Sequence, residues 1–313
     1  MNILISGSLA YDRIMDFPGR FEDHILPEKI HILNVCFTVN GLVEKFGGTA
    51  GNIAYNLSLL RETPTVVAAA GRDFARYERW LTEHGLPLTG IRRVSEEFTA
   101  SAYITTDLSD NQITGFNPGA MKHPALFPLE GLDPAGTIAI VSPGNLDDMV
   151  TYSRMFRELG IRFICDPGQS IPALTGDRLV EMFTGAELLI TNDYELEMIR
   201  KATEMDMPEI LECCPMVVTT LGEEGSTIHW REEEMEIPPV PPAKVADPTG
   251  AGDAYRSGML KGIVTGKDWV TAAQMGATCA SFAVEEVGTQ EHDFRWEQFV
   301  ERYERFFGES PEA

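Results

Sequence analysis

The sequence predicts an α/β fold: a doubly wound, largely parallel sheet flanked by helices, with a small antiparallel β lid beside it. Three observations indicate this. Short apolar runs alternate with stretches of helical periodicity, an order that builds a parallel sheet with helices on both faces. After Gly250 the chain is mostly helical, in three segments. Two β-rich segments interrupt the alternation, and these are assigned to the lid.

The alternating runs are the expected elements of the core. Ile53, Leu57 and Leu60 share one face of a helix expected at residues 50–61. Asp73 and Asn145 are expected to cap the next two helices, which Gly85 and Gly160 end. These helices run to His84 and Leu159. Strands are expected at residues 2–6, 65–70, 137–142, 162–166, 187–191 and 216–220.

The lid is expected from segments at about 12–46 and 97–119, with the remainder of a single 1–313 domain forming the core. Residues 31–46 are rich in β-type side chains such as Val35, Phe37 and Val39. Residues 98–106 and 112–116 predict a hairpin across a polar turn. Such a lid would lie over the crevice at the strand ends, where ligands bind in this fold class. An uncovered lid sheet also offers a surface for a homodimer.

Composition restricts the partners. The 313 residues carry 48 acidic side chains against 25 Lys and Arg, a formal charge of -23. Such a chain is repelled by nucleic acid and by anionic membranes, so neither is an expected partner, whereas local backbone dipoles can still hold small anions. An odd number of cysteines, five, with no CxxC pair, indicates a reducing cytoplasm. The apolar start lacks a basic region and predicts a strand, not a signal peptide.

The strongest motif is the run Asp247-Pro248-Thr249-Gly250-Ala251-Gly252-Asp253, followed by a helical stretch. Small residues at a helix N-terminus let backbone amides approach a charged oxygen, so Gly250, Ala251 and Gly252 form a candidate anion hole. Asp253 could take a proton from a hydroxyl that attacks phosphate. The alternative is a glycine-rich helix start with an acid in a favourable place.

Other nucleotide and metal motifs are missing from the sequence. The run Gly262-Ile263-Val264-Thr265-Gly266-Lys267 has three residues between its glycines, where a P-loop has four, and Asp268 follows the lysine. No GxGxxG follows the first strand, which argues against a nicotinamide enzyme. No HExxH or paired Cys/His spacing supports a zinc site.

A second cluster, Gly47-Gly48-Thr49-Ala50-Gly51-Asn52, opens the first helix. Gly48 has no side chain, so a ligand could lie against its backbone. Asn52 offers a donor and an acceptor, which suits vicinal sugar hydroxyls. Asp12 follows the first strand and could accept hydrogen bonds from hydroxyls. The alternatives are a tight turn and a solvated loop acid.

These two clusters resemble the signatures of the ribokinase/PfkB family of sugar and nucleoside kinases. Within it, the chain is most similar to the bacterial adenosine kinases, through an N-terminal run at 6–12, a second run at 17–21, and further runs at 116–121, 191–195, 218–222 and 288–291. The resemblance covers nearly the whole chain and implies a ribokinase-like fold.

The resemblance also implies roles for particular residues. Asp253 would be the catalytic base, with the amides of Gly250, Ala251 and Gly252 around the transferring phosphoryl group. Asn192 and Glu195 match an NxxE motif that positions Mg²⁺ through water, although a capped helix explains them equally. The nucleotide-binding loop would comprise Thr220, Gly222 and Gly225. The ribose side would comprise Ser8, Asp12, Gly48 and Asn52.

The lid and one strand end would complete the substrate site. Tyr103 and Phe116 lie on the expected hairpin, where aromatic rings can stack on a purine, and Cys36 lies on the other lid segment. Ordinary packing of the lid is the alternative. Gln169 follows a strand and could reach the substrate; some relatives carry a second glutamine where this chain has Ser170.

The function so implied is ATP-dependent phosphorylation of the 5′-hydroxyl of adenosine to AMP, with ADP released, in purine salvage in the cytoplasm. ATP and Mg²⁺ are the expected cofactors. Two alternatives stay open: another sugar or nucleoside kinase of the same family, and a non-catalytic nucleoside-binding protein that keeps the fold. The intact motif ending at Asp253 argues against the second.

Overall fold

The large sheet forms the centre of the molecule. A computed structural model of the chain describes residues 1–231 and 233–311. Across these residues nine strands form one sheet in the order β13-β12-β11-β10-β9-β8-β1-β4-β5, parallel except at β11–β12 and β12–β13. The strands are β1 (Asn2–Ser6), β4 (Thr65–Gly71), β5 (Ile91–Val94), β8 (Thr137–Val141), β9 (Arg162–Cys165), β10 (Leu188–Asn192), β11 (Met216–Thr220), β12 (Ser226–Trp230) and β13 (Glu233–Ile237).

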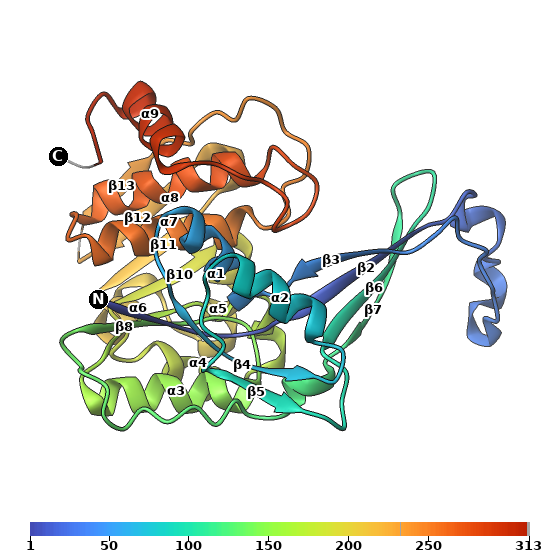
Figure 1. Cartoon of the computed structure of the whole chain (residues 1–313), viewed down its shortest axis with the longest axis horizontal. Coiled ribbons are helices and arrows are strands. Elements are labelled where there is room, and N and C mark those ends of the chain that lie inside the picture. The colour runs from blue at the N-terminus through green and yellow to red at the C-terminus, as the bar shows by residue number, and fades with distance from the viewer. Residues whose placement is uncertain (232, 312–313) are drawn as a thin grey trace.

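Helices cover both faces of this sheet (Figure 1). Successive residues of β1 point to opposite faces, so Ile3 and Ile5 join one buried cluster and Leu4 joins another. The first cluster draws side chains from α1, α2, α7 and α8, and the second from α3 to α6. The helices are α1 (Thr49–Leu59), α2 (Ala75–Glu83), α3 (Leu146–Leu159), α4 (Gly176–Phe183), α5 (Asp193–Thr203), α6 (Met207–Cys213), α7 (Ala251–Val264), α8 (Trp269–Ala283) and α9 (Trp296–Phe307).

The doubly wound core confirms the expected fold class, and most element ends lie within a few residues of their predicted positions. Asn145 caps α3, since its side chain accepts from the amides of Asp147 and Asp148, and Gly160 ends it with φ of 69°. The cap predicted at Asp73 is wrong. Its carboxylate accepts instead from the Thr99 amide at 2.7 Å and from Arg13 at 3.1 Å, so it ties the core to the lid.

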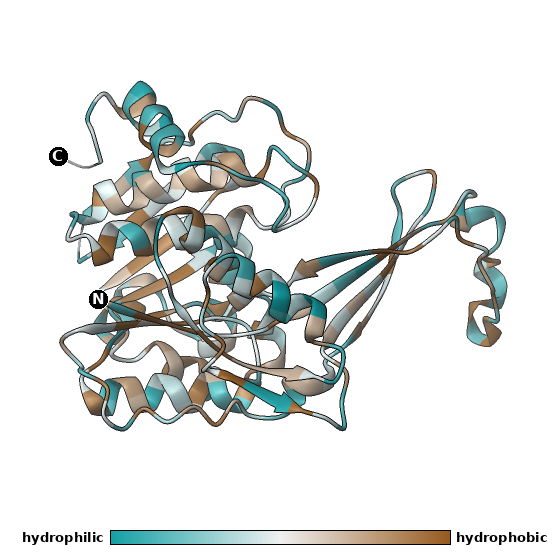
Figure 2. Ribbon diagram, viewed as in Figure 1, coloured by the Kyte–Doolittle hydropathy of each residue, from teal (hydrophilic) through white to brown (hydrophobic). Residues whose placement is uncertain are grey.

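Within the described part of the chain, the lid is a four-stranded sheet in the order β3-β2-β6-β7 that projects from the core (Figure 1). Its outer pairs are antiparallel as expected, whereas β2 and β6 pair in parallel. In Figure 2 the strands of the core are more uniformly hydrophobic than those of the lid. The lid strands are β2 (Ala10–Asp16), β3 (Val43–Gly47), β6 (Ala100–Thr106) and β7 (Gln112–Asn117).

The strand predicted over 31–46 is wrong for most of its length, because β3 begins only at Val43. Residues 27–32 form a 3₁₀ helix, and residues 33–42 have no strand. Phe37 instead packs in a local aromatic cluster, with its ring 4.8 Å from that of Phe17 and 5.0 Å from that of Phe21. The β-type side chains of this segment therefore serve local packing at the tip of the lid.

No helix among the described residues is both long and apolar enough to cross a membrane.

Candidate active site

The predicted anion hole lies at the N-terminus of α7. Gly250 is the N-cap and has φ of 86°, a left-handed conformation that glycine adopts without strain. The Ala251 amide donates to the Pro248 carbonyl at 3.2 Å. Helix geometry leaves the amides of Gly252 and Asp253 without an intrahelical acceptor, so these two are the donors best placed to bind an anion.

Asp253 lies in the first turn of α7, where it meets α1. The Asn52 side chain donates through Nδ2 to Oδ2 of Asp253 at 2.8 Å. Burial raises the pKa of the Asp253 carboxyl above its ordinary value, the charge of Arg256 and the bond from Asn52 oppose the rise, and Glu195 adds to it. One carboxylate oxygen of Asp253 is thus held by Asn52.

A buried ion pair contacts the backbone of the predicted anion hole. Arg256, one turn after Gly252, contacts Asp166 through Nε at 2.5 Å and Nη2 at 2.7 Å. Its Nη1 donates to the Gly252 carbonyl at 3.0 Å, and Nη2 lies 4.0 Å from Glu195. Burial raises the pKa of Asp166, and the pairing with Arg256 opposes the rise. The guanidinium thereby joins the end of β9, the helix start and α5.

The turn into α1 is shaped by Ser8 and Gly48, two residues that the sequence analysis predicted to bind the substrate. The buried Ser8 hydroxyl accepts from the Thr49 amide at 3.1 Å, so it caps α1. Gly48 has φ of 87°, and a Cβ there would lie 2.7 Å from the Ser8 carbonyl and the Ala10 amide. Protein backbone therefore already occupies the space where a side chain at 48 would lie, and both residues shape the turn that presents Asn52.

Asp12 faces this turn from the lid. It stands opposite Lys45 in the antiparallel β2–β3 pair, and its Oδ2 would lie 2.5 Å from a Cβ built on Gly47. Lys45 in turn donates to the Val287 carbonyl at 2.5 Å. Burial raises the pKa of Asp12 to about 6, although Lys45 opposes the rise. The predicted ribose acid thus lies at the junction of the lid and the core.

The lid sheet separates the two aromatics that were predicted together. The register pairs Asp12 with Ala102 and Ala102 with Phe116, so Phe116 shares the face of Asp12. Tyr103 pairs with Arg13 and lies on the opposite face, where its hydroxyl accepts from Arg13 Nη1 at 2.7 Å. Tyr103 therefore supports the lid, and Phe116, with half of its surface exposed, is the aromatic on the site side.

Asn192 and Glu195 form a reciprocal capping box at the start of α5. The Glu195 amide donates to Asn192 Oδ1 at 2.7 Å, and the Asn192 amide donates to Glu195 Oε2 at 2.9 Å. Each side chain keeps further polar atoms for a ligand. No group of three or more His, Cys, Asp or Glu among the described residues could hold a metal ion.

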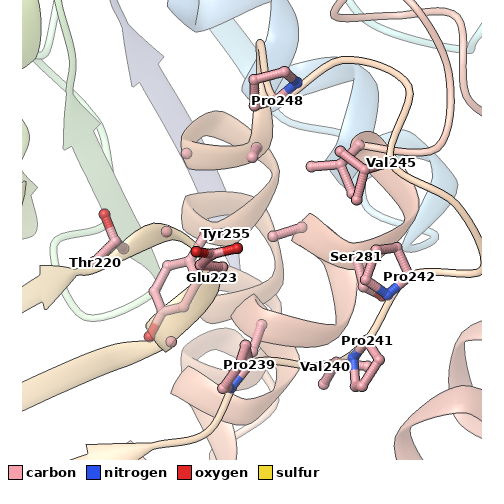
Figure 3. Close-up of a pocket in the computed structure, with 17 residues that line it drawn as sticks. Thr220, Glu223, Pro239, Val240, Pro241, Pro242, Val245, Pro248, Tyr255 and Ser281 are labelled. Carbon is pink, nitrogen blue, oxygen red and sulfur yellow. The ribbon is translucent and has the colours of Figure 1, made fainter.

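A pocket of about 590 Å³ opens beside the anion hole (Figure 3). It is lined by Ala251 and Gly252 at one end and by apolar residues such as Val240 and Tyr255 along its walls. The predicted nucleotide loop contributes Thr220, Gly222 and Gly225. The structure thus brings together the predicted anion hole and the predicted nucleotide loop, which are separated by 25 residues or more in the sequence.

Two further predicted substrate residues, Cys36 and Gln169, are exposed. Cys36 is exposed, and its segment lies at the far tip of the lid, away from α7 (Figure 1). Gln169 is exposed on the 3₁₀ turn Gly168–Ala173 that follows β9. Sequence reasoning gave no role to Arg256 or Asp166, and it included Gln290 only as part of the run at 288–291 that carries the resemblance. A charged residue inside the apolar run after Asp253 was the available signal for the first.

Comparison with known families agrees with this geometry. The model of the pfkB family carbohydrate kinases matches residues 23–295. The chain belongs to this family. Its fold, a mostly parallel sheet flanked by helices with a small second sheet, is ribokinase-like, as the resemblance implied.

Relatives within the pfkB family extend the likeness. A nucleoside kinase of Methanocaldococcus jannaschii is 32% identical over 282 residues, 89% of this chain and 92% of that one. The Burkholderia thailandensis nucleoside kinase in complex with inosine has a TM-score of 0.84 and 36% identity, and the match covers 99% of this chain and all of that one. The same kinase in complex with ADP-inosine has a TM-score of 0.82, 37% identity, and coverage of 99% and 97%.

Proposed function

We propose that the chain is an ATP-dependent nucleoside kinase that phosphorylates the 5′-hydroxyl of adenosine in purine salvage. One observation carries the proposal. The start of α7 has the large pocket on one side, through Ala251 and Gly252, and Asn52 on the other, through Asp253. A phosphate donor in the pocket and a hydroxyl beside Asp253 would meet at the same helix N-terminus, where its dipole favours negative charge.

The reaction then follows from these positions. The 5′-oxygen attacks the γ-phosphorus of ATP, the bond from that phosphorus to the β–γ bridging oxygen breaks, and ADP leaves. Asp253 takes the hydroxyl proton on its free carboxylate oxygen. The Gly252 and Asp253 amides stabilise charge on the transferring group. Mg²⁺, held through water by Asn192 and Glu195, would neutralise phosphate charge.

Another purine nucleoside is the second candidate substrate. The Burkholderia kinase was solved with inosine, and it matches this chain over nearly its whole length. A panel of adenosine, inosine, guanosine, cytidine and free ribose, each with ATP and Mg²⁺, tests the assignment. The proposal expects the highest kcat/KM for adenosine. A higher kcat/KM for inosine would make inosine the substrate in place of adenosine, and the proposed nucleoside kinase activity would stand.

Replacing Phe116 with alanine should raise KM for adenosine by roughly tenfold to a hundredfold, because a stacked aromatic contributes about 1–3 kcal/mol per base. Ribose has no base to stack, so its phosphorylation should hardly change. Ile113→Ala is the matched control, since Ile113 is similarly exposed on the same strand but faces the other side. Equal losses for adenosine and ribose would show that Phe116 only supports lid packing.

Acidification should lower kcat/KM for the nucleoside, because it protonates Asp12. Its pKa of about 6 means that the carboxylate accepts hydroxyl hydrogen bonds above this pH and is neutral below it. We therefore expect kcat/KM for adenosine to rise between about pH 5 and about pH 7. Asp12→Asn should lower kcat/KM and remove this step from the profile. A variant that keeps the step would assign it to another group.

We further propose that a second copy of the chain covers the lid. The tip of the lid exposes large apolar side chains, which singly are ordinary but together favour association: Leu26, Ile30, Ile32, Leu33, Leu42 and Val43, each at least 49% exposed.

All five cysteines are free thiols, which supports the proposed cytoplasmic location.

A further inference from the structure

A chain of side-chain hydrogen bonds, buried at its centre and partly buried at its two ends, leads to Asp253. The Trp80 indole Nε1 donates to Gln290 Oε1 at 2.8 Å, and Gln290 Nε2 donates to Asn52 Oδ1 at 2.9 Å. Asn52 Nδ2 then donates to Asp253 Oδ2 at 2.8 Å. We call these four residues the relay. They come from α2, the loop before α9, α1 and α7, so tertiary packing alone brings them together.

The chemistry of its two ends gives the relay one direction. An indole N–H can only donate, so Gln290 must turn its oxygen to Trp80 and its amino group to Asn52. Asn52 must then accept from Gln290 and direct its own amino group to Asp253. An ionised carboxylate can only accept, so the far end requires the same direction. The orientation of both amides is thus fixed by their partners.

Tyr77 holds the middle of the relay. Its hydroxyl donates to the Gly47 carbonyl at 2.8 Å and accepts from Gln290 Nε2 at 2.7 Å. Gln290 is only 2% exposed, and every one of its side-chain polar atoms has a partner. Water therefore cannot easily reach Gln290 to replace a lost hydrogen bond. Loss of one bond of the relay would leave buried polar groups unpaired.

We propose that Gln290 and Trp80 are positioning residues for the catalytic base: through Asn52 they hold one oxygen of Asp253 and leave the other directed to the substrate hydroxyl. The role rests on the proposed function of Asp253 as base. The bond from Asn52 also favours the charged carboxylate, the form that can take a proton. The ionisable groups that interact with Asp253 besides the relay are Arg256, Asp166, Glu195 and Tyr77.

Two variants test the relay. Gln290→Met keeps the length of the side chain and removes its hydrogen bonds. Trp80→Phe removes the indole N–H and keeps a ring beside Phe46 and Tyr55, which now stack on it. Trp230→Phe, on the distant β12 strand, is the matched control. Two readouts are needed: steady-state kinetics, and the carboxyl carbon signal of Asp253 followed by NMR against pH in the ligand-free protein, assigned by its loss in Asp253→Asn.

The relay predicts graded effects. Gln290→Met should lower kcat by about tenfold to a hundredfold and raise the pKa of Asp253, because the bond from Asn52 that lowers this pKa is then less firmly held. Trp80→Phe should lower kcat by roughly threefold to tenfold, since Gln290 then loses its fixed direction but keeps its amide. KM for ATP should not change in either variant, because its proposed pocket lies on the other side of α7. Trp230→Phe should match the wild type.

The outcomes separate the relay from the proposed function. A folded Gln290→Met protein with unchanged kcat and unchanged Asp253 pKa would overturn the relay. If Gln290→Met does not fold, Trp80→Phe is the deciding variant. A Trp80→Phe protein with the kcat and the Asp253 pKa of the wild type would overturn the relay. A shifted Asp253 pKa in a protein whose wild type phosphorylates no nucleoside or sugar would keep the hydrogen-bonded relay and refute the proposed function.

Discussion

Asp253→Asn should lower kcat by roughly a hundredfold or more, with less effect on nucleoside binding. Asparagine has the shape of aspartate, so its oxygen can still accept the 2.8 Å bond from Asn52. Its amino group then faces the substrate hydroxyl, where it cannot accept a proton. The variant also removes a partly buried charge whose pKa burial raises, so folding should be preserved.

The measurement is kcat under saturating ATP and adenosine, with nucleoside binding followed separately by calorimetry. Asp147→Asn is a control for the substitution itself, since Asp147 is an exposed residue of α3 that pairs with Arg178. A variant at 253 with nearly normal turnover would remove Asp253 from the reaction.

Gly252→Val should lower kcat by about a hundredfold to a thousandfold, the usual cost of losing one donor to a developing anion. A Cβ at Gly252 would lie 2.9 Å from Arg256 Nη1. That guanidinium cannot move aside easily, because Asp166 holds it at 2.5 and 2.7 Å. The branched side chain must therefore displace the start of α7 or cover the Gly252 amide.

Adenosine should still bind to this variant, because Asp12, Asn52 and Phe116 lie on α1 and the lid. Gly115→Val is the matched control, since a Cβ at that lid position meets nothing within 4 Å. Persistent turnover with ATP would mean that the glycine run is a structural helix start and does not bind phosphate.

The core could be predicted because its signals are local. The strand β1 is buried on both faces and reads as an apolar run, and α3 carries both a capping asparagine and a terminal glycine. The lid strand β2 was missed because Asp12 and Arg13 interrupt its apolar pattern. Asp12 lies opposite Lys45 in the lid sheet. Arg13, on the other face, pairs with Glu44 of the lid and with Asp73 of the core. No local pattern reveals such pairings.

The candidate site was predictable where a motif carries it. The run ending at Asp253 and the position of Asn52 were identified, and the structure joins them directly. Tyr103 was grouped with Phe116 because composition does not tell the two faces of a strand apart without its register. The roles of Gln290 and Arg256 were missed because they depend on partners more than 80 residues away in the sequence.

The proposed function requires that phosphate is transferred to a nucleoside and not to a free sugar. A competition decides this, in which adenosine and ribose, at equal concentration, share one limiting pool of ATP and Mg²⁺. Phosphorus NMR then identifies the products. We expect adenosine 5′-monophosphate to account for nearly all of the transferred phosphate. Ribose phosphate as the main product, or no transfer to either acceptor, would refute the proposed nucleoside kinase activity.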